Sequence, residues 1–98
     1  MPQKEGSYLP LGDLSLFTKI ASDTREMVIA NKVDAAKTRI DDIEHEWDKA
    51  QATLKPMNAA KWTEVDDAID KVLRQLRVVN PNMQNCKAAL DALLMTLK

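Results

Sequence analysis

Apolar side chains recur in four stretches of the chain, each with alternating steps of three and four residues. This spacing places them on one face of an α-helix, whereas a half-buried strand would alternate every second residue. The first two stretches consist of Leu14, Phe17, Ala21, Thr24 and Val28, with Ile20 and Met27 beside them, and of Val33, Ala36, Ile40, Ile43, Trp47, Ala50 and Leu54. The other two consist of Trp62, Val65, Ile69, Val72, Leu76 and Val79, and of Met83, Cys86, Leu90, Leu93 and Leu97, with Ala89 and Leu94 beside them. The pattern predicts four amphipathic helices.

Breaks between these stripes indicate where the helices end. The step from Val28 to Val33 is five residues, which rotates the stripe out of line, and Asn31 tolerates the left-handed conformation that ends a helix. Proline disfavours helical geometry in the residue before it, so the second helix ends before Pro56, whereas Pro81 suits a first helical turn. Residues expected to cap or start helices are Asp13, Asp34 and Asn58. The expected helices are 14–30, 34–54, 59–79 and 82–97.

Short connections determine how these helices pack. Helices joined by only a few residues run antiparallel to their neighbours, so we predict an all-α fold, an antiparallel up-down-up-down four-helix bundle over residues 13–98. Residues 1–12 contain proline and glycine and show no periodicity, which predicts a flexible N-terminal lead-in. The predicted structural core consists of Phe17, Ile40, Ile43, Trp47, Trp62, Val65, Ile69, Val72, Leu76, Cys86, Leu90 and Leu93.

Composition narrows the class of protein. The 98 residues suffice for one domain, and 14 basic against 15 acidic side chains argue against a nucleic-acid binder, which needs a basic face. Two glycines are too few for an all-β fold with many tight turns. The single cysteine, Cys86, cannot form an internal disulfide. The first residues lack the apolar run of a signal peptide, and no stretch approaches the roughly 20 apolar residues of a membrane span, so we expect a soluble chain without membrane insertion.

The two tryptophans are predicted to meet inside the bundle. Trp47 and Trp62 lie on the inward stripes of adjacent antiparallel helices, nine and six residues from Pro56, and therefore at similar heights. The main interpretation is a bulky aromatic layer of the core. The alternative is a wall for an apolar or planar ligand.

A second candidate site lies on the expected second helix. Asp41, Glu44, His45 and Asp48 follow one another at i, i+3, i+4 and i+7, which places three carboxylates and an imidazole on one face. Such a set can hold a hard or borderline divalent metal ion. The heptad that turns Trp47 inward turns His45 outward, so the alternative is an ordinary solvated face.

The sequence gives little indication of a nucleophile, a haem site or a di-iron site. Cys86 lies on an inward stripe and is interpreted as a small buried hydrophobe, not a nucleophile. Haem and di-iron sites need inward histidines or carboxylates, whereas the only histidine is His45. A phosphate-binding glycine loop and a nucleophile elbow are both absent. We therefore expect no enzyme and no cofactor.

Charged residues on the outer faces have two interpretations. Lys71, Arg74 and Arg77 form a modest basic cluster, which either meets an anionic partner or stays solvated. Pairs of opposite charge four residues apart are expected on the helix surface at Asp67 with Lys71, Asp70 with Arg74, and Lys37 with Asp41.

Several leucines have no obvious place in narrow helix seams. Leu9, Leu11, Leu16 and Leu94 are candidates for an exposed apolar patch that binds a partner, or for the place where the N-terminal segment docks. Leu16, Leu94 and Leu73 are likewise candidates for self-association.

One set of motifs resembles a known group of proteins. The motifs are Lys37-Thr38-Arg39-Ile40-Asp41-Asp42-Ile43-Glu44, Trp47-Asp48, Leu54-Lys55-Pro56, Trp62, Val65-Asp66 and Ala68-Ile69-Asp70. They resemble small helical domains of uncharacterised bacterial proteins, many of them exported, over about residues 13–96. The resemblance implies a bacterial source and an extracytoplasmic, for example periplasmic, setting if a signal peptide was removed, and otherwise a cytoplasmic one. It implies no activity or site residues.

Together these patterns favour a non-enzymatic function. Four well-formed stripes without a catalytic constellation indicate a small helical interaction or accessory domain, of the bacterial envelope if the resemblance holds. The alternative is a ligand- or metal-binding bundle that uses the Trp47 and Trp62 layer or the face from Asp41 to Asp48.

Overall fold

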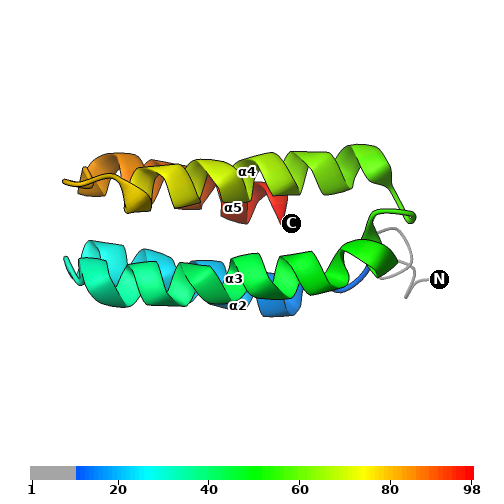
Figure 1. Cartoon of the computed structure of the whole chain (residues 1–98), viewed down its shortest axis with the longest axis horizontal. Coiled ribbons are helices and arrows are strands. Elements are labelled where there is room, and N and C mark those ends of the chain that lie inside the picture. The colour runs from blue at the N-terminus through cyan, green and yellow to red at the C-terminus, as the bar shows by residue number, and fades with distance from the viewer. Residues whose placement is uncertain (1–10) are drawn as a thin grey trace.

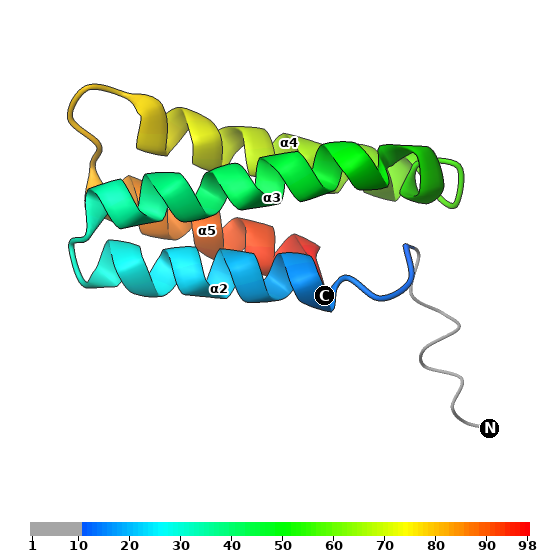
Figure 2. The ribbon, with the colours of Figure 1, turned by 60° about the horizontal axis from the view of Figure 1, so that its bottom comes forward.

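The chain forms four antiparallel helices around one core. The computed structural model describes residues 11–98, which contain no strand. Its helices are α2 (Ser15–Ile29), α3 (Val33–Leu54), α4 (Ala59–Arg77) and α5 (Met83–Thr96). Consecutive helices run in opposite directions, and both α2 and α4 pack on α3 and on α5 (Figures 1 and 2). The predicted all-α, up-down-up-down four-helix bundle is confirmed. No helix within residues 11–98 combines the length and the apolar character that crossing a membrane requires.

The bundle has two unlike ends (Figure 2). The first, here called the loop end, consists of residues 25–37 and 74–87 and contains the α2–α3 and α4–α5 connections. The opposite end, here called the hairpin end, contains the α3–α4 turn at residues 55–58, the start of α2 and the end of α5. Because α3 and α4 are longer than α2 and α5, their hairpin projects beyond the other two helices (Figure 1).

The helix α2 ends as the sequence predicts. Asn31 adopts the left-handed conformation, with φ of 60°. Its backbone N–H donates to the carbonyl of Val28, and the N–H of Lys32 donates to the carbonyl of Met27. These two bonds form the Schellman arrangement, which satisfies carbonyls that a helix end would otherwise leave unpaired. The break between α2 and α3 therefore has a local cause in the sequence.

Helix starts agree with the prediction in most cases. Asn58 caps α4 by accepting from the N–H of Lys61, and Asn82 caps α5 in the same way. Asp13 was expected to cap α2, but the helix begins one residue later and its cap residue is Leu14; the carboxylate of Asp13 accepts from the N–H of Ser15. Asp34 does not cap α3 but lies inside its first turn, where its negative charge favours the helix dipole.

The end of α4 is a correction to the sequence prediction. The helix was expected to reach Val79 but ends at Arg77, and Val78 is extended with ψ of 162°. Val79, which was assigned to the inward stripe, is 92% exposed. Pro81 was expected in the first turn of α5, but it precedes the cap of that helix. The chain therefore leaves helical geometry three residues before the proline and needs Val78 to Pro81 to turn back.

All twelve side chains of the predicted structural core are buried. Leu73, which was expected to lack a place in the seam, is buried as well. It lies beside Val72 on α4, so the apolar face of that helix is wider than a single stripe. Leu94 packs partly against the core, whereas Leu16 is about half exposed. The apolar surface proposed for self-association at these leucines is therefore reduced to Leu16.

The prediction for residues 1–12 needs correction at its C-terminal end. Residues 1–10, and with them Leu9, lie outside the described residues. Leu11 was assigned to a flexible lead-in, yet its side chain is 1% exposed and belongs to the core cluster. Gly12 follows with φ of 74°, a conformation that favours glycine, and lies beside Met57 of the α3–α4 turn. The segment from Leu11 therefore packs against the projecting hairpin.

Ion pairs join neighbouring helices more often than the sequence predicts. Asp23 on α2 pairs with Arg39 on α3, Asp91 on α5 pairs with Arg25 on α2, and Asp41 and Glu44 on α3 pair with Arg77 on α4. The expected pairs of Asp67 with Lys71, Asp70 with Arg74, and Lys37 with Asp41 are not among the ion pairs of residues 11–98. Four of the eight ion pairs therefore join different helices, and the other four join residues three or four apart on one helix.

Candidate functional site

The two tryptophans meet as predicted. The rings of Trp47 and Trp62 stack with centroids 5.6 Å apart and an angle of 17° between their planes. Phe17 from α2 meets Trp47 edge-on at 5.1 Å, and Trp47 Nε1 donates to the carboxylate of Asp66 at 3.2 Å. Both tryptophans are buried, so three helices share one aromatic layer. This arrangement supports the interpretation as core.

A ligand wall at this layer has less structural support. The outer face of Trp62 is covered by the ammonium group of Lys55, 5.1 Å from the ring centroid. Neither tryptophan lines either of the two surface hollows described below. Trp62 Nε1 is buried without a hydrogen-bond partner among residues 11–98, a loss that typically costs about 1–3 kcal/mol. The rings fill the space between the helices.

The metal-binding face predicted on α3 is used in another way. Asp41 and Glu44 each accept from Arg77 at 2.8 Å, so a guanidinium group already neutralises two of the four expected ligands. His45 and Asp48 are exposed on the same helix. Within residues 11–98 the acidic, histidine and cysteine ligand atoms converge elsewhere, and the predicted four do not form such a group. The expectation of a metal site at these residues is not supported by the geometry.

The acidic side chains that do converge lie on α4. Carboxylate oxygens of Asp66, Asp67 and Asp70 lie within 4.8 Å of one another. Burial raises the pKa of Asp66, the charge of Asp70 raises it further, and Asp67 and Asp48 act in the same direction. The hydrogen bond from Trp47 opposes these effects on the pKa. Within residues 11–98 these three carboxylates make no ion pair, and one of them is half-buried. Their mutual repulsion therefore lowers the stability of the fold, and they do not form a site by themselves.

This cost predicts a pH-dependent effect of Asp66→Asn. Because the folded pKa of Asp66 is raised, its ionised form destabilises the fold at neutral pH, and that penalty disappears as the pH falls through the raised pKa. We expect Asp66→Asn to raise the free energy of unfolding at pH 7 and to have little effect in acid, as measured by urea denaturation across pH.

The control for this prediction has the opposite sign. A hydrogen bond from Arg39 lowers the pKa of Asp23, so its stabilising contribution is present above the unfolded pKa and is lost as the pH falls through the folded one. Asp23→Asn should therefore lower stability at pH 7. Equal effects of the two variants at pH 7 would contradict the prediction for Asp66.

Cys86 lies where its stripe places it. The thiol is buried on α5 and lies 3.5 Å from the carbonyl oxygen of Gln75. Burial raises the pKa of Cys86, which disfavours the reactive thiolate. The side chain therefore packs as a small hydrophobe and offers no nucleophile to the surface.

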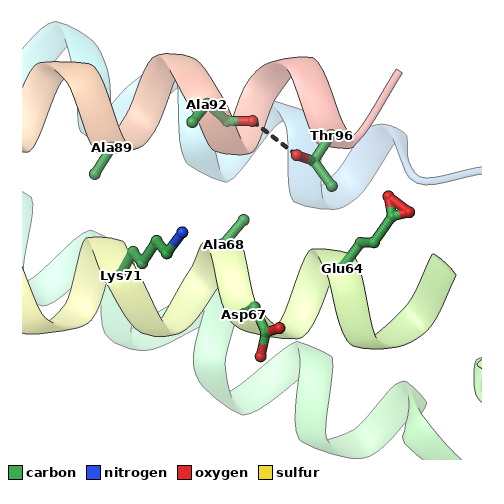
Figure 3. A pocket seen from close by; sticks show the side chains of 7 residues that line it. All are labelled: Glu64, Asp67, Ala68, Lys71, Ala89, Ala92 and Thr96. Carbon is green, nitrogen blue, oxygen red and sulfur yellow. Dashed lines mark hydrogen bonds between the residues drawn. The ribbon is translucent and has the colours of Figure 1, made fainter. Parts of the chain in front are cut away.

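A shallow groove runs between α4 and α5 (Figure 3). Its volume is about 310 Å³, and alanine side chains such as Ala68 and Ala89 point into it. Glu64 and Lys71 rise from α4 at its sides, whereas Asp67 points away toward α3. The hydroxyl of Thr96 donates to the carbonyl of Ala92 and so is already satisfied. Small side chains create this groove.

A second hollow lies at the loop end, between the end of α2 and the start of α5. It also has a volume of about 310 Å³, and its wall consists of Val28, Ile29, Met83, Gln84 and Lys87. Pockets for drug-sized ligands span roughly 300–1,000 Å³, so this hollow suits a single large side chain better than a cofactor. Its surface is more strongly apolar than that of the groove in Figure 3.

Large apolar side chains are exposed at the same end. Ile29 is 54% exposed, and Val78 and Val79 in the α4–α5 connection are 48% and 92% exposed. A valine this exposed contributes nothing to the core. The sequence carries a signal for this surface, since Val78 and Val79 directly precede an Asn-Pro break, but the helical period alone assigned Val79 to the interior.

The apolar patch predicted from leucines has a different composition in the structure. Leu11 is buried and Leu94 is partly covered, which leaves Leu16 exposed at the hairpin end together with Met57 and Met95.

No family model, no curated protein and no solved structure matches this chain. Function is therefore inferred from the surface geometry, and the loop end is the candidate functional site.

Proposed function

We propose that this chain is a small, non-enzymatic helical interaction domain that binds a protein partner through its loop end. The observation that carries this proposal is the exposed apolar surface of Ile29, Val78 and Val79 at the end of the bundle that also holds an apolar hollow. Exposed apolar side chains of this kind are typical of protein-binding surfaces, and Ile29 also lines the hollow. Burying apolar surface against a partner contributes roughly 25 cal/mol per Å² before the costs of association.

The arrangement of polar groups also favours binding over catalysis. Enzymes need convergent polar groups in a concave site. Here the two hollows have mainly ordinary helix-surface side chains in their walls, and the one thiol, of Cys86, is buried. The alternative of a metal-binding or ligand-binding bundle has less support, because Arg77 engages two of the expected ligands and the tryptophan rings stack on each other.

The setting of this proposed function comes from the sequence resemblance. Similarity to domains of exported bacterial proteins suggests that the domain works in the bacterial envelope. An accessory role there requires a stable scaffold with an exposed apolar surface, and a four-helix bundle with exposed apolar side chains at its loop end fits this requirement.

A peptide selection tests the proposed function. The immobilised chain would be used to select binders from a random peptide library displayed on phage. We expect the enriched peptides to bind the wild-type chain and to lose most of their binding to an Ile29→Ser, Val79→Ser double variant. Both side chains are exposed, so this variant should keep its fold, which circular dichroism would verify.

The hairpin end supplies a matched control. Leu16→Ser with Met95→Ser also removes two exposed apolar side chains, but at the opposite end of the bundle. This control should leave peptide binding unchanged. Selected peptides that bind the loop-end variant as well as the wild type would show that the loop end is not the docking surface.

A further inference from the structure

One edge of the aromatic layer lies at the hairpin end of the bundle. Trp62 is near the start of α4, and the ammonium group of Lys55 in the α3–α4 turn lies 5.1 Å from its ring centroid. The ring therefore belongs to the part of the α3–α4 hairpin that projects beyond the other two helices (Figure 1). Because α2 begins only at Ser15 and α5 ends at Thr96, neither helix closes this end of the core.

A buried donor at this edge has no acceptor in the described part of the chain. Trp62 is 8% exposed, and its Nε1 is the only buried side-chain polar atom of residues 11–98 without a hydrogen-bond partner. Buried polar groups in folded proteins are nearly always paired. A bound water fits poorly, because it needs two to four polar partners and no second unpaired side-chain atom is buried within the described range. The indole therefore indicates an acceptor from elsewhere.

The chain before Leu11 is attached at this same end. Leu11 is 1% exposed and belongs to the core cluster, and a Cβ added to Gly12 would lie 3.7 Å from the terminal methyl group of Met57. Met57 precedes Trp62 by five residues. Three extended residues span up to roughly 10 Å. The N-terminal segment, here residues 1–10, is therefore anchored within reach of the Trp62 indole.

The sequence of the N-terminal segment supplies the groups that this edge lacks. Tyr8 and Leu9 are adjacent large apolar side chains, and Met57 at the hairpin end is 53% exposed. Pro10 biases Leu9 toward extended geometry. An extended segment that is not part of a sheet keeps its carbonyl groups available to a donor outside the segment. Both apolar cover and a hydrogen-bond acceptor are thus present just before Leu11.

We propose that the N-terminal segment crosses the hairpin end, where a backbone carbonyl of Tyr8 or Leu9 accepts a hydrogen bond from Trp62 Nε1. The two side chains then cover the edge of the aromatic layer beside Met57. The segment acts as a cover that can lift without unfolding the helices, because Leu11 has its own place in the core. Its release exposes apolar surface opposite the loop end, so this inference does not rest on the proposed function.

Nuclear magnetic resonance of the isotope-labelled full chain tests the contact directly. The indole proton of Trp62 should show nuclear Overhauser cross-peaks to protons of Tyr8 or Leu9, and it should exchange slowly with solvent. Trp47 Nε1 is the internal reference, since it is already hydrogen-bonded to Asp66. Trp47→Phe removes one of the two indole signals and so assigns both.

A Tyr8→Ser, Leu9→Ser double variant tests the cover. We expect the Trp62 indole to exchange about tenfold faster in this variant, whereas the backbone amides of the core exchange as in the wild type. Leu16→Ser with Met95→Ser is the matched control, because it also removes two exposed apolar side chains from the hairpin end. This control should leave the exchange rate of the Trp62 indole unchanged.

Each outcome decides for or against the cover. Cross-peaks to Tyr8 or Leu9 together with faster exchange in the double variant would establish it. Equal exchange of the Trp62 indole in the wild type and the double variant would overturn it. Cross-peaks to a bound water, with none to Tyr8 or Leu9, would also overturn it, because water would then be the acceptor. None of these results affects the tests of binding at the loop end, which use other variants.

Discussion

Replacing Trp47 by alanine is expected to lower the free energy of unfolding by about 3–5 kcal/mol. The side chain is 1% exposed, stacks on Trp62 and meets Phe17 edge-on, so its removal leaves a cavity where three helices join. A domain of this size has a total stability of roughly 5–15 kcal/mol, and such a loss takes much of it. Urea denaturation followed by far-UV circular dichroism measures the change directly.

Two further variants separate the contributions of Trp47. Trp47→Phe keeps an aromatic ring but removes the donor to Asp66, and it should cost less than the alanine variant. Met95→Ala removes an exposed side chain and should change stability by only about 0.5 kcal/mol or less. If Trp47→Ala destabilised the chain no more than Met95→Ala, the aromatic layer would not be the centre of the core.

The interior of the bundle follows directly from the sequence. A helix buries one face, so steps of three and four residues identify which side chains lie inside, and the relation of Trp47 and Trp62 to Pro56 predicts their contact. Helix ends were predictable where a single side chain determines them, as at Asn31 and Asn58. These features depend on the spacing of residues along the chain, which can be read directly from the sequence.

The surface depends on contacts that local spacing does not record. Arg77 pairs with Asp41 and Glu44 because α4 lies beside α3. These two carboxylates are therefore engaged by a guanidinium group, although the sequence predicts them as metal ligands. Val79 continues the helical period but lies in the connection, since the chain must turn before Asn82 caps α5. The candidate site at the loop end combines α2, α5 and a connection, so it becomes visible only when the helices are assembled.

Leu11 is the clearest case of a residue whose importance is tertiary, and Leu11→Ala should lower the free energy of unfolding by about 2–5 kcal/mol. The residue precedes the first helix and has no periodic partner, yet it is 1% exposed. Gly12, with φ of 74°, turns the chain next to Met57, so Leu11 can pack under the projecting α3–α4 hairpin. Its removal therefore uncovers an end of the core that α2 and α5 are too short to cover.

Leu16→Ala is a matched comparison for this prediction. It makes the same change at a half-exposed position five residues away, so it should lower the free energy of unfolding only slightly. Leu11→Met nearly conserves volume and should cost less than about 1.5 kcal/mol. Urea denaturation of all three variants gives the comparison. If Leu11→Ala were as mild as Leu16→Ala, residue 11 would belong to the lead-in that the sequence predicts. A large loss confined to Leu11→Ala would instead place the start of the folded domain at residue 11, two residues before the predicted boundary.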